Sequence, residues 1–165
     1  MMNTQNKNEA VRRAYWIEQA DLAYDFMNKM HKYPVAECGE PMLSLRQAVK
    51  DARLTVKFGD TKIAEKYDRV FYLREGLVKK FLAVAKKMNN SGWFLKVEDS
   101  FRSKAMQRDI GLQEHIFDFI LQKVIWEKNG EIPSPELMFR RFTAFVATAP
   151  KIGTHMSGSA IDISV

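Results

Sequence analysis

The most informative stretch of the sequence lies at its end: Gly153-Thr154-His155-Met156-Ser157-Gly158-Ser159-Ala160-Ile161-Asp162-Ile163-Ser164-Val165. Apolar and polar residues alternate from Ser159 onward, which is the pattern of a half-buried β-strand. A period of two places three apolar side chains on one face of this strand, namely Ile161, Ile163 and Val165. The polar Asp162 therefore lies on the opposite face of the predicted strand.

His155 and Asp162 are candidate metal ligands, because imidazole and carboxylate groups both bind zinc at about 2.0 to 2.2 Å. Seven fully extended residues would span roughly 23 Å, so the chain must double back before both side chains can reach one ion. Gly158 can supply this reversal, since glycine adopts φ > 0 without steric cost. Two such residues also occur in ordinary surface loops, where Asp162 would only cap a turn. Residues 154–159 could also be left over from an expression tag, but they lie inside the chain and lead directly into the predicted strand, which argues against that origin.

The pattern His-x-x-Gly-x-Ala-x-Asp, filled by His155, Gly158, Ala160 and Asp162, resembles the signature of D-alanyl-D-alanine dipeptidases of the VanX type and of related zinc D,D-peptidases. The resemblance implies that His155 and Asp162 hold one Zn²⁺ ion. Members of this family usually carry serine two positions before the histidine, where this chain has Gly153. A substrate contact from that serine is therefore not expected here.

A second motif, Asp99-Ser100-Phe101-Arg102, follows a predicted strand at about 93–98 that is rich in aromatic and branched residues. An aspartate and an arginine three positions apart can form a local salt bridge, or the arginine can stabilise an oxyanion. In VanX-type enzymes a strand ends in Asp-x-(Tyr/Phe)-Arg, and the resemblance implies that Arg102 is catalytic and stabilises the transition state. Asp99 would orient this arginine or bind substrate. The family usually continues with proline, where this chain has Ser103, a suitable helix N-cap.

Composition predicts a globular chain with one domain, residues 1–165, since 46% of its 165 residues are hydrophobic. The net charge of +6 could favour an anionic partner. However, the basic pairs fall inside helix-like segments and are better explained as solvated helix faces, so no nucleic-acid partner is expected; these pairs are Arg12-Arg13, Lys79-Lys80, Lys86-Lys87 and Arg140-Arg141. Cys38 is the only cysteine, which excludes an internal disulfide.

The amino-terminal residues contain no apolar core of a signal peptide, and no apolar run approaches the roughly 20 residues that a membrane helix needs. We therefore expect a soluble, cytoplasmic protein without a membrane span. A periplasmic location stays open, because a signal peptide that had been removed would leave no trace.

Apolar periodicity predicts amphipathic helices at about 9–30, 74–89 and 104–128, and a further helix from Pro135 with Ser134 as its N-cap. Residues 42–56 are a weaker helix candidate. His31 and His115 lie within or beside these helices and are not counted as ligands. The predicted fold class is α+β. The resemblance implies several helices packed on a small antiparallel sheet, like that of Hedgehog and D,D-peptidase domains, with an amino-terminal helical extension at about 9–31.

A catalytic zinc normally takes three protein ligands and water, and hydrolysis also needs a base. No glutamate or histidine follows His155, so the interpretation is that the domain is incomplete at its carboxyl end. The expected function is a zinc-dependent dipeptidase that hydrolyses D-alanyl-D-alanine, a cell-wall precursor dipeptide. The alternatives are a D,D-carboxypeptidase, an L-alanyl-D-glutamate endopeptidase, or a non-catalytic module that binds peptidoglycan or a protein. The oligomeric state and the metal's identity are left open.

Overall fold

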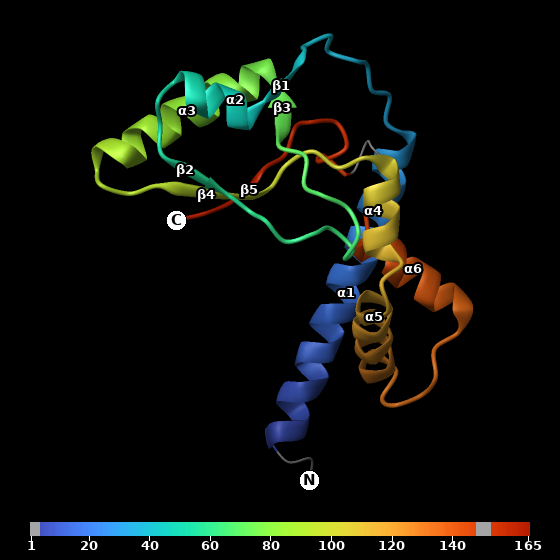
Figure 1. The fold of residues 1–165 in the computed structure, drawn as a ribbon. Helices are drawn as coiled ribbons and strands as arrows, with labels where there is room; N and C mark the ends of the chain where they lie inside the picture. The colour runs from blue at the N-terminus through green and yellow to red at the C-terminus, as the bar shows by residue number, and fades with distance from the viewer. Residues whose placement is uncertain (1–3, 148–152) are drawn as a thin grey trace. The chain divides into compact units, whose positions relative to one another are not determined.

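The computed structural model describes residues 4–147 and 153–165, with side chains from residue 8 onward (Figure 1). The chain forms two compact units, which are described separately. Unit 1 comprises Met1–Pro34 and Gly111–Thr148, and unit 2 comprises Val35–Ile110 and Ala149–Val165. All the residues singled out for function from the sequence belong to unit 2.

Unit 1 is helical. Its helices are α1 (Thr4–Lys32), α5 (Glu114–Glu127) and α6 (Pro135–Phe145). The other elements are β1 (Met42–Ser44), α2 (Leu45–Asp51), β2 (Val56–Phe58), β3 (Tyr72–Arg74), α3 (Glu75–Asn90), β4 (Leu95–Asp99), α4 (Lys104–Gly111) and β5 (Asp162–Ser164). All of these belong to unit 2 apart from the last residue of α4. The predicted α+β class is therefore confirmed.

The strands of unit 2 form two small sheets, and one of them is mixed. β1 pairs with β3 in an antiparallel ladder. In the other sheet the order is β2-β4-β5, with β4 parallel to β2 and antiparallel to β5. The expectation of a purely antiparallel sheet is wrong, because the chain passes through β3 and the long helix α3 between β2 and β4. Such a crossover connection is what parallel strands require.

Helix α3 covers the sheet that carries β4. Its apolar side chains recur at helical spacing, and Val78, Phe81 and Ala85 are buried. They join a core cluster with residues of α2, of β3 and its flank, and of β4, namely Leu45, Val49, Phe71, Leu73, Leu95 and Val97. Gly92 follows α3 with a φ of +78°, a left-handed conformation that is typical of a helix end, and the helix predicted at about 74–89 is confirmed. Strand β4 thereby has a fixed position in the core.

Three predicted elements differ from the structure. The single helix expected at 104–128 is divided into α4 and α5, because α4 ends at Gly111, a residue that weakens helix continuation. Of residues 42–56, only α2 is helical, since Met42–Ser44 pairs with β3 instead. The last strand begins at Asp162 rather than Ser159, whose amide donates to the Thr154 carbonyl within the preceding turn at 2.9 Å.

The helices of unit 1 pack around a buried ion pair. Arg141 in α6 is 1% exposed and donates from Nε to Glu127 of α5 at 2.8 Å. Its Nη1 donates to Asp21 of α1 at 2.7 Å. Ser134 accepts from the Leu137 amide, as predicted for the cap of α6. The helix expected at 9–31 thus packs against α5 and α6 within its own unit.

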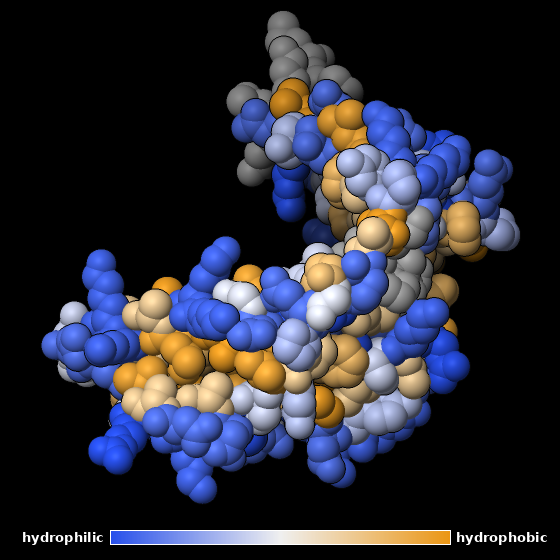
Figure 2. Space-filling view, turned by 90° about the horizontal axis from the view of Figure 1, so that it is seen from above, coloured by the Kyte–Doolittle hydropathy of each residue, from blue (hydrophilic) through white to orange (hydrophobic). Residues whose placement is uncertain are grey.

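An apolar groove of about 210 Å³ opens on unit 2 between α3 and β5. Leu77, Phe81, Val84, Leu95, Ile161 and Ile163 contribute to its lining. Figure 2 shows hydrophobic residues gathered between hydrophilic ones on its left side, over the part of unit 2 that contains α3. Within residues 4–147 and 153–165, no helix combines the length and the apolar character that crossing a membrane requires.

The contacts of Asp109 in α4 make the stability of unit 2 dependent on pH under acidic conditions. The Lys66 ammonium, the Tyr67 hydroxyl and the Arg108 guanidinium all contact its carboxylate and lower its pKa well below the usual range. A carboxylate whose pKa is lowered by folding stabilises the folded state at pH values above its ordinary pKa of about 4. This stabilisation is lost as the pH falls below that value. We expect the free energy of unfolding of Asp109→Asn to fall less steeply below pH 4 than that of the wild type. Urea denaturation between pH 2 and pH 6 measures this, and parallel curves would contradict it.

Candidate metal centre

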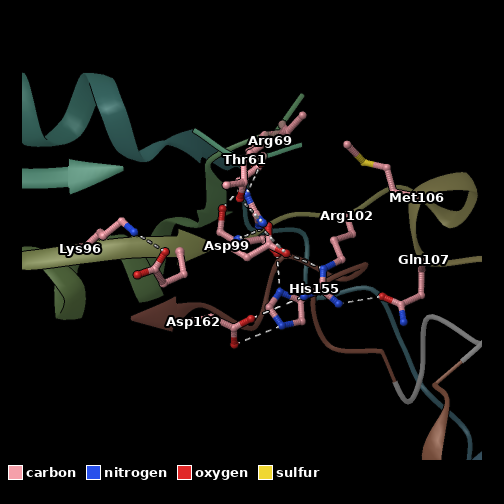
Figure 3. Close-up of polar contacts among 12 residues, drawn as sticks. Thr61, Arg69, Lys96, Asp99, Arg102, Met106, Gln107, His155 and Asp162 are labelled. Carbon is pink, nitrogen blue, oxygen red and sulfur yellow. Dashed lines mark hydrogen bonds and ion pairs between the residues drawn. The ribbon is translucent and has the colours of Figure 1, made fainter. Parts of the chain in front are cut away.

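Strands β4 and β5 bring two aspartates to the same place in unit 2. In their antiparallel ladder Asp99, at the end of β4, is the partner of Asp162, at the start of β5. The register is irregular between Val97 and Asp99. His155 comes from the turn that precedes β5, and Figure 3 shows its ring between the two carboxylates. One ligand atom from each of these three residues lies within 4.8 Å of the others.

His155 and Asp162 converge as predicted. The Nε2 atom of His155 lies 3.5 Å from Oδ1 of Asp162. Two ligand atoms that are each about 2.1 Å from a tetrahedral zinc ion lie about 3.4 Å from one another. The observed separation therefore fits a shared ion. The role of the two side chains as zinc ligands stays a prediction.

The backbone of Ser100 determines which nitrogen of His155 is available. Nδ1 of His155 lies 2.5 Å from the Ser100 carbonyl oxygen. A carbonyl oxygen can only accept, so Nδ1 must carry the proton and donate it. In the neutral imidazole the lone pair then belongs to Nε2, the atom that faces Asp162. Histidine ligands of metals are usually oriented by such a hydrogen bond from the other nitrogen.

Asp99 is the most deeply buried member of the group, at 4% exposure. Its Oδ2 accepts from Arg102 Nε at 2.6 Å and lies 3.2 Å from Arg69 Nη1. Its Oδ1 accepts from the Ser100 amide at 2.9 Å. Because two guanidinium groups already compensate its charge, Asp99 is better suited to orienting Arg102 than to binding a cation directly. The substrate-binding role considered for Asp99 stays a prediction.

The Arg102 guanidinium contacts Asp99 at one end and extends toward Gln107 and Asp162 at the other. The salt bridge foreseen between Asp99 and Arg102 is present, and it leaves the far end of the guanidinium directed elsewhere. Nη1 donates to Gln107 Oε1 at 3.1 Å, and Nη2 lies 3.5 Å from Asp162 Oδ2. The guanidinium is thus held beside the His155 and Asp162 pair (Figure 3). Ser103, as expected, accepts from the Met106 amide and caps α4.

The charges of the group balance without a cation. Asp99 and Asp162 supply two negative charges, and Arg69 and Arg102 supply two positive charges. Asp162 is the more accessible carboxylate, with a side chain that is 53% exposed. Its contacts with Arg102 and His155 are both 3.5 Å long. A divalent cation would therefore displace only weak contacts by binding to Asp162 and His155.

The turn that presents His155 is held by its own geometry as well. Gly158 has a φ of +71°, which confirms the predicted reversal. The Arg102 amide donates to the His155 carbonyl at 3.3 Å. A Cβ atom added at Gly158 would collide with Sδ of Met42 in β1. The backbone conformation at this position therefore favours glycine, and an added Cβ would also require the flexible end of the Met42 side chain to move.

Three contributors to the site were missed from the sequence: the Arg69 guanidinium, the Gln107 amide and the Ser100 carbonyl. Arg69 lies in a segment without periodicity, and its contact with Asp99 depends on the tertiary fold. Gln107 lies one turn into α4, five residues after Arg102. Its position near the arginine could therefore have been predicted from the sequence spacing. The Ser100 carbonyl belongs to the backbone and leaves no signal in residue identities.

In the part of the chain that the structure describes, Asp99, His155 and Asp162 make up the one cluster of metal-binding residue types. His31 and His115 lie outside it. Comparison of the chain with protein-family models, with curated proteins and with solved structures finds no match. The interpretation of this centre therefore depends on its own geometry and on the motif resemblance.

Gly158→Ala tests the reversal beside the candidate metal centre. We expect the free energy of unfolding to decrease by more than the roughly 1 to 2 kcal/mol that a left-handed conformation costs a residue with a Cβ atom. Gly92→Ala is a matched control, because Gly92 has a φ of +78° and no atom within 4 Å of an added Cβ. Chemical denaturation of both variants isolates the contact with Met42. Equal destabilisation would show that this contact imposes no cost.

Proposed function

We propose that this protein is a zinc-dependent dipeptidase that hydrolyses D-alanyl-D-alanine, on a fold of the Hedgehog and D,D-peptidase type. The observation that carries the proposal is the 3.5 Å approach of His155 Nε2 to Asp162 Oδ1, with the imidazole oriented by the Ser100 carbonyl. The motif resemblance supplies the substrate class. A small dipeptide is the expected partner, and a cytoplasmic or periplasmic location stays a prediction.

His155 and Asp162 would hold the zinc ion, since their donor atoms and separation suit it. A zinc ion bound there supplies a water molecule of lowered pKa and polarises the scissile carbonyl. Arg102 would stabilise the negative charge that develops on the carbonyl oxygen, because its guanidinium lies beside Asp162 and is fixed by Asp99 and Gln107. Asp99 keeps this arginine in place.

A non-catalytic role remains the second candidate, and one observation favours it. Asp99 is engaged by two arginines, so His155 and Asp162 are the two ligands readily available among the described residues. A site with two protein ligands can bind a cation and an anionic peptide without hydrolysing it. Hydrolysis and binding are separated by measuring both on protein made from the complete coding sequence.

Zinc binding tests the centre directly. Metal-free protein should take up one zinc ion in titration calorimetry, and His155→Ala and Asp162→Asn should each weaken binding by at least 100-fold, because each removes one of two ligands. His115→Ala is the control, since it removes an exposed histidine of α5. Zinc affinity that is unchanged in both ligand variants would contradict the proposal.

The substrate is tested on protein made from the complete coding sequence. We expect zinc-loaded protein to release alanine from D-alanyl-D-alanine, and Arg102→Ala to lower turnover by about 10² to 10³-fold, as removal of an oxyanion donor does. Activity of Arg102→Ala within a few-fold of the wild type would show that this arginine has another role. Cleavage of longer D,D-peptides or of L-alanyl-D-glutamate peptides would identify the carboxypeptidase or the endopeptidase instead. Zinc binding without any cleavage would favour the binding module.

A further inference from the structure

Arg74 contacts the turn that presents His155, although it lies outside the metal centre. It is the last residue of β3. Its Nε donates to the Ser157 carbonyl at 2.9 Å, and its backbone amide donates to the Gly158 carbonyl at 3.0 Å. One residue therefore holds two successive carbonyl groups at the far end of the turn.

The other side of the Arg74 guanidinium is fixed as well. Nη1 donates to the Glu40 carbonyl at 2.6 Å, and Nη2 donates to Glu37 Oε2 at 2.9 Å. The Gly39 amide and the Arg74 guanidinium lower the pKa of Glu37, so its carboxylate stays charged at neutral pH. Arg74 thereby connects the turn to the segment at residues 37–40 and to the end of a paired strand.

External contacts add to the internal hydrogen bonds of the turn, which are of uneven length. The Met156 amide donates to the Gly153 carbonyl at 2.8 Å, and the Ser159 amide donates to the Thr154 carbonyl at 2.9 Å. The backbone bonds from Ser157 to Thr154 and from Gly158 to His155 are both 3.3 Å long. At the near end, the backbone of Arg102 and the Ser100 carbonyl hold His155. At the far end, Arg74 performs the equivalent task.

We propose that Arg74 is a positioning residue of the metal centre, which fixes the turn at residues 153–158 so that His155 Nε2 stays opposite Asp162. It touches neither of the two proposed ligands and acts through the backbone of Ser157 and Gly158. The identity of the cation rests on the proposed function, whereas the anchoring of the turn does not. Residues that orient metal ligands typically change metal affinity by about 10 to 100-fold when they are replaced.

The experiment compares Arg74→Met with Arg46→Met. Methionine keeps much of the aliphatic stem and removes every donor of the guanidinium. Arg46 is the matched control, because its guanidinium lies over the rings of Phe58 and Phe71, 4.5 and 4.7 Å from their centroids. In metal-free protein we expect the amides of Ser157 and Gly158 to exchange their hydrogens at least 10-fold faster in Arg74→Met, and at the wild-type rate in Arg46→Met.

Zinc titration of the same variants gives the second readout. Arg74→Met should bind zinc about 10 to 100-fold more weakly than the wild type, with Arg46→Met unchanged. Unchanged amide exchange in Arg74→Met would overturn the proposal, and so would faster exchange with wild-type zinc affinity. A wild-type protein that binds no zinc would contradict the proposed function instead, and the exchange rates would still decide whether Arg74 anchors the turn.

Arg74→Lys provides a second test in case Arg74→Met does not fold. Lysine keeps the charge beside Glu37 but cannot reproduce the fork that contacts Ser157, Glu40 and Glu37 together. We expect this variant to fold and to show faster exchange of the Ser157 and Gly158 amides with weaker zinc binding. Wild-type values of both quantities in a folded Arg74→Lys protein would also overturn the proposal.

Discussion

The hydrogen bond between Nδ1 of His155 and the carbonyl oxygen of Ser100 is the interaction on which the candidate metal centre depends. It decides the tautomer of the imidazole, because the carbonyl can only accept a proton donor. It also aims Nε2 at Asp162. Without this bond the two residues could lie close together and still present a donor N–H to the carboxylate. Because of this bond, the Nε2 lone pair of the neutral ring faces the Asp162 carboxylate, as a shared cation would require.

The position of that carbonyl follows from the sheet. Ser100 directly follows β4, which lies between β2 and β5 and is buried under α3. Ser100 is itself buried, and its hydroxyl donates to the Val70 carbonyl at 3.1 Å. The antiparallel pairing of β4 with β5 then brings Asp162 beside Asp99. The site is thus built at one end of a strand whose place is set by the hydrophobic core.

Local sequence signals predicted the parts of this arrangement that depend on short-range physics. The helix α3, the Ser134 cap and the left-handed Gly158 follow from periodicity, hydrogen-bonding capacity and steric freedom. The convergence of His155 with Asp162 was expected as one of two outcomes, the other being an ordinary surface loop in which Asp162 only caps a turn. The catalytic and binding roles assigned to these residues stay predictions.

Long-range pairing was not readable from the same signals. The parallel pairing of β2 with β4 joins segments separated by α3. Proline and glycine residues interrupt the apolar pattern of residues 34–60, so the sequence does not show this pairing. Two arginines share Asp99, and one of them lies in an irregular segment far from the motif. Arg74 reaches the turn from 83 residues away. Such contacts arise from the packing of the whole unit, and no spacing in the sequence records them.

The tautomer of His155 tests the central claim most directly. In a ¹⁵N-edited NMR spectrum of metal-free protein near neutral pH, we predict that the proton resides on Nδ1 and that Nε2 has the chemical shift of an unprotonated nitrogen. Addition of zinc should then perturb Nε2 far more than Nδ1. A neutral ring protonated on Nε2 would contradict the account, because that nitrogen could not then share a cation with Asp162.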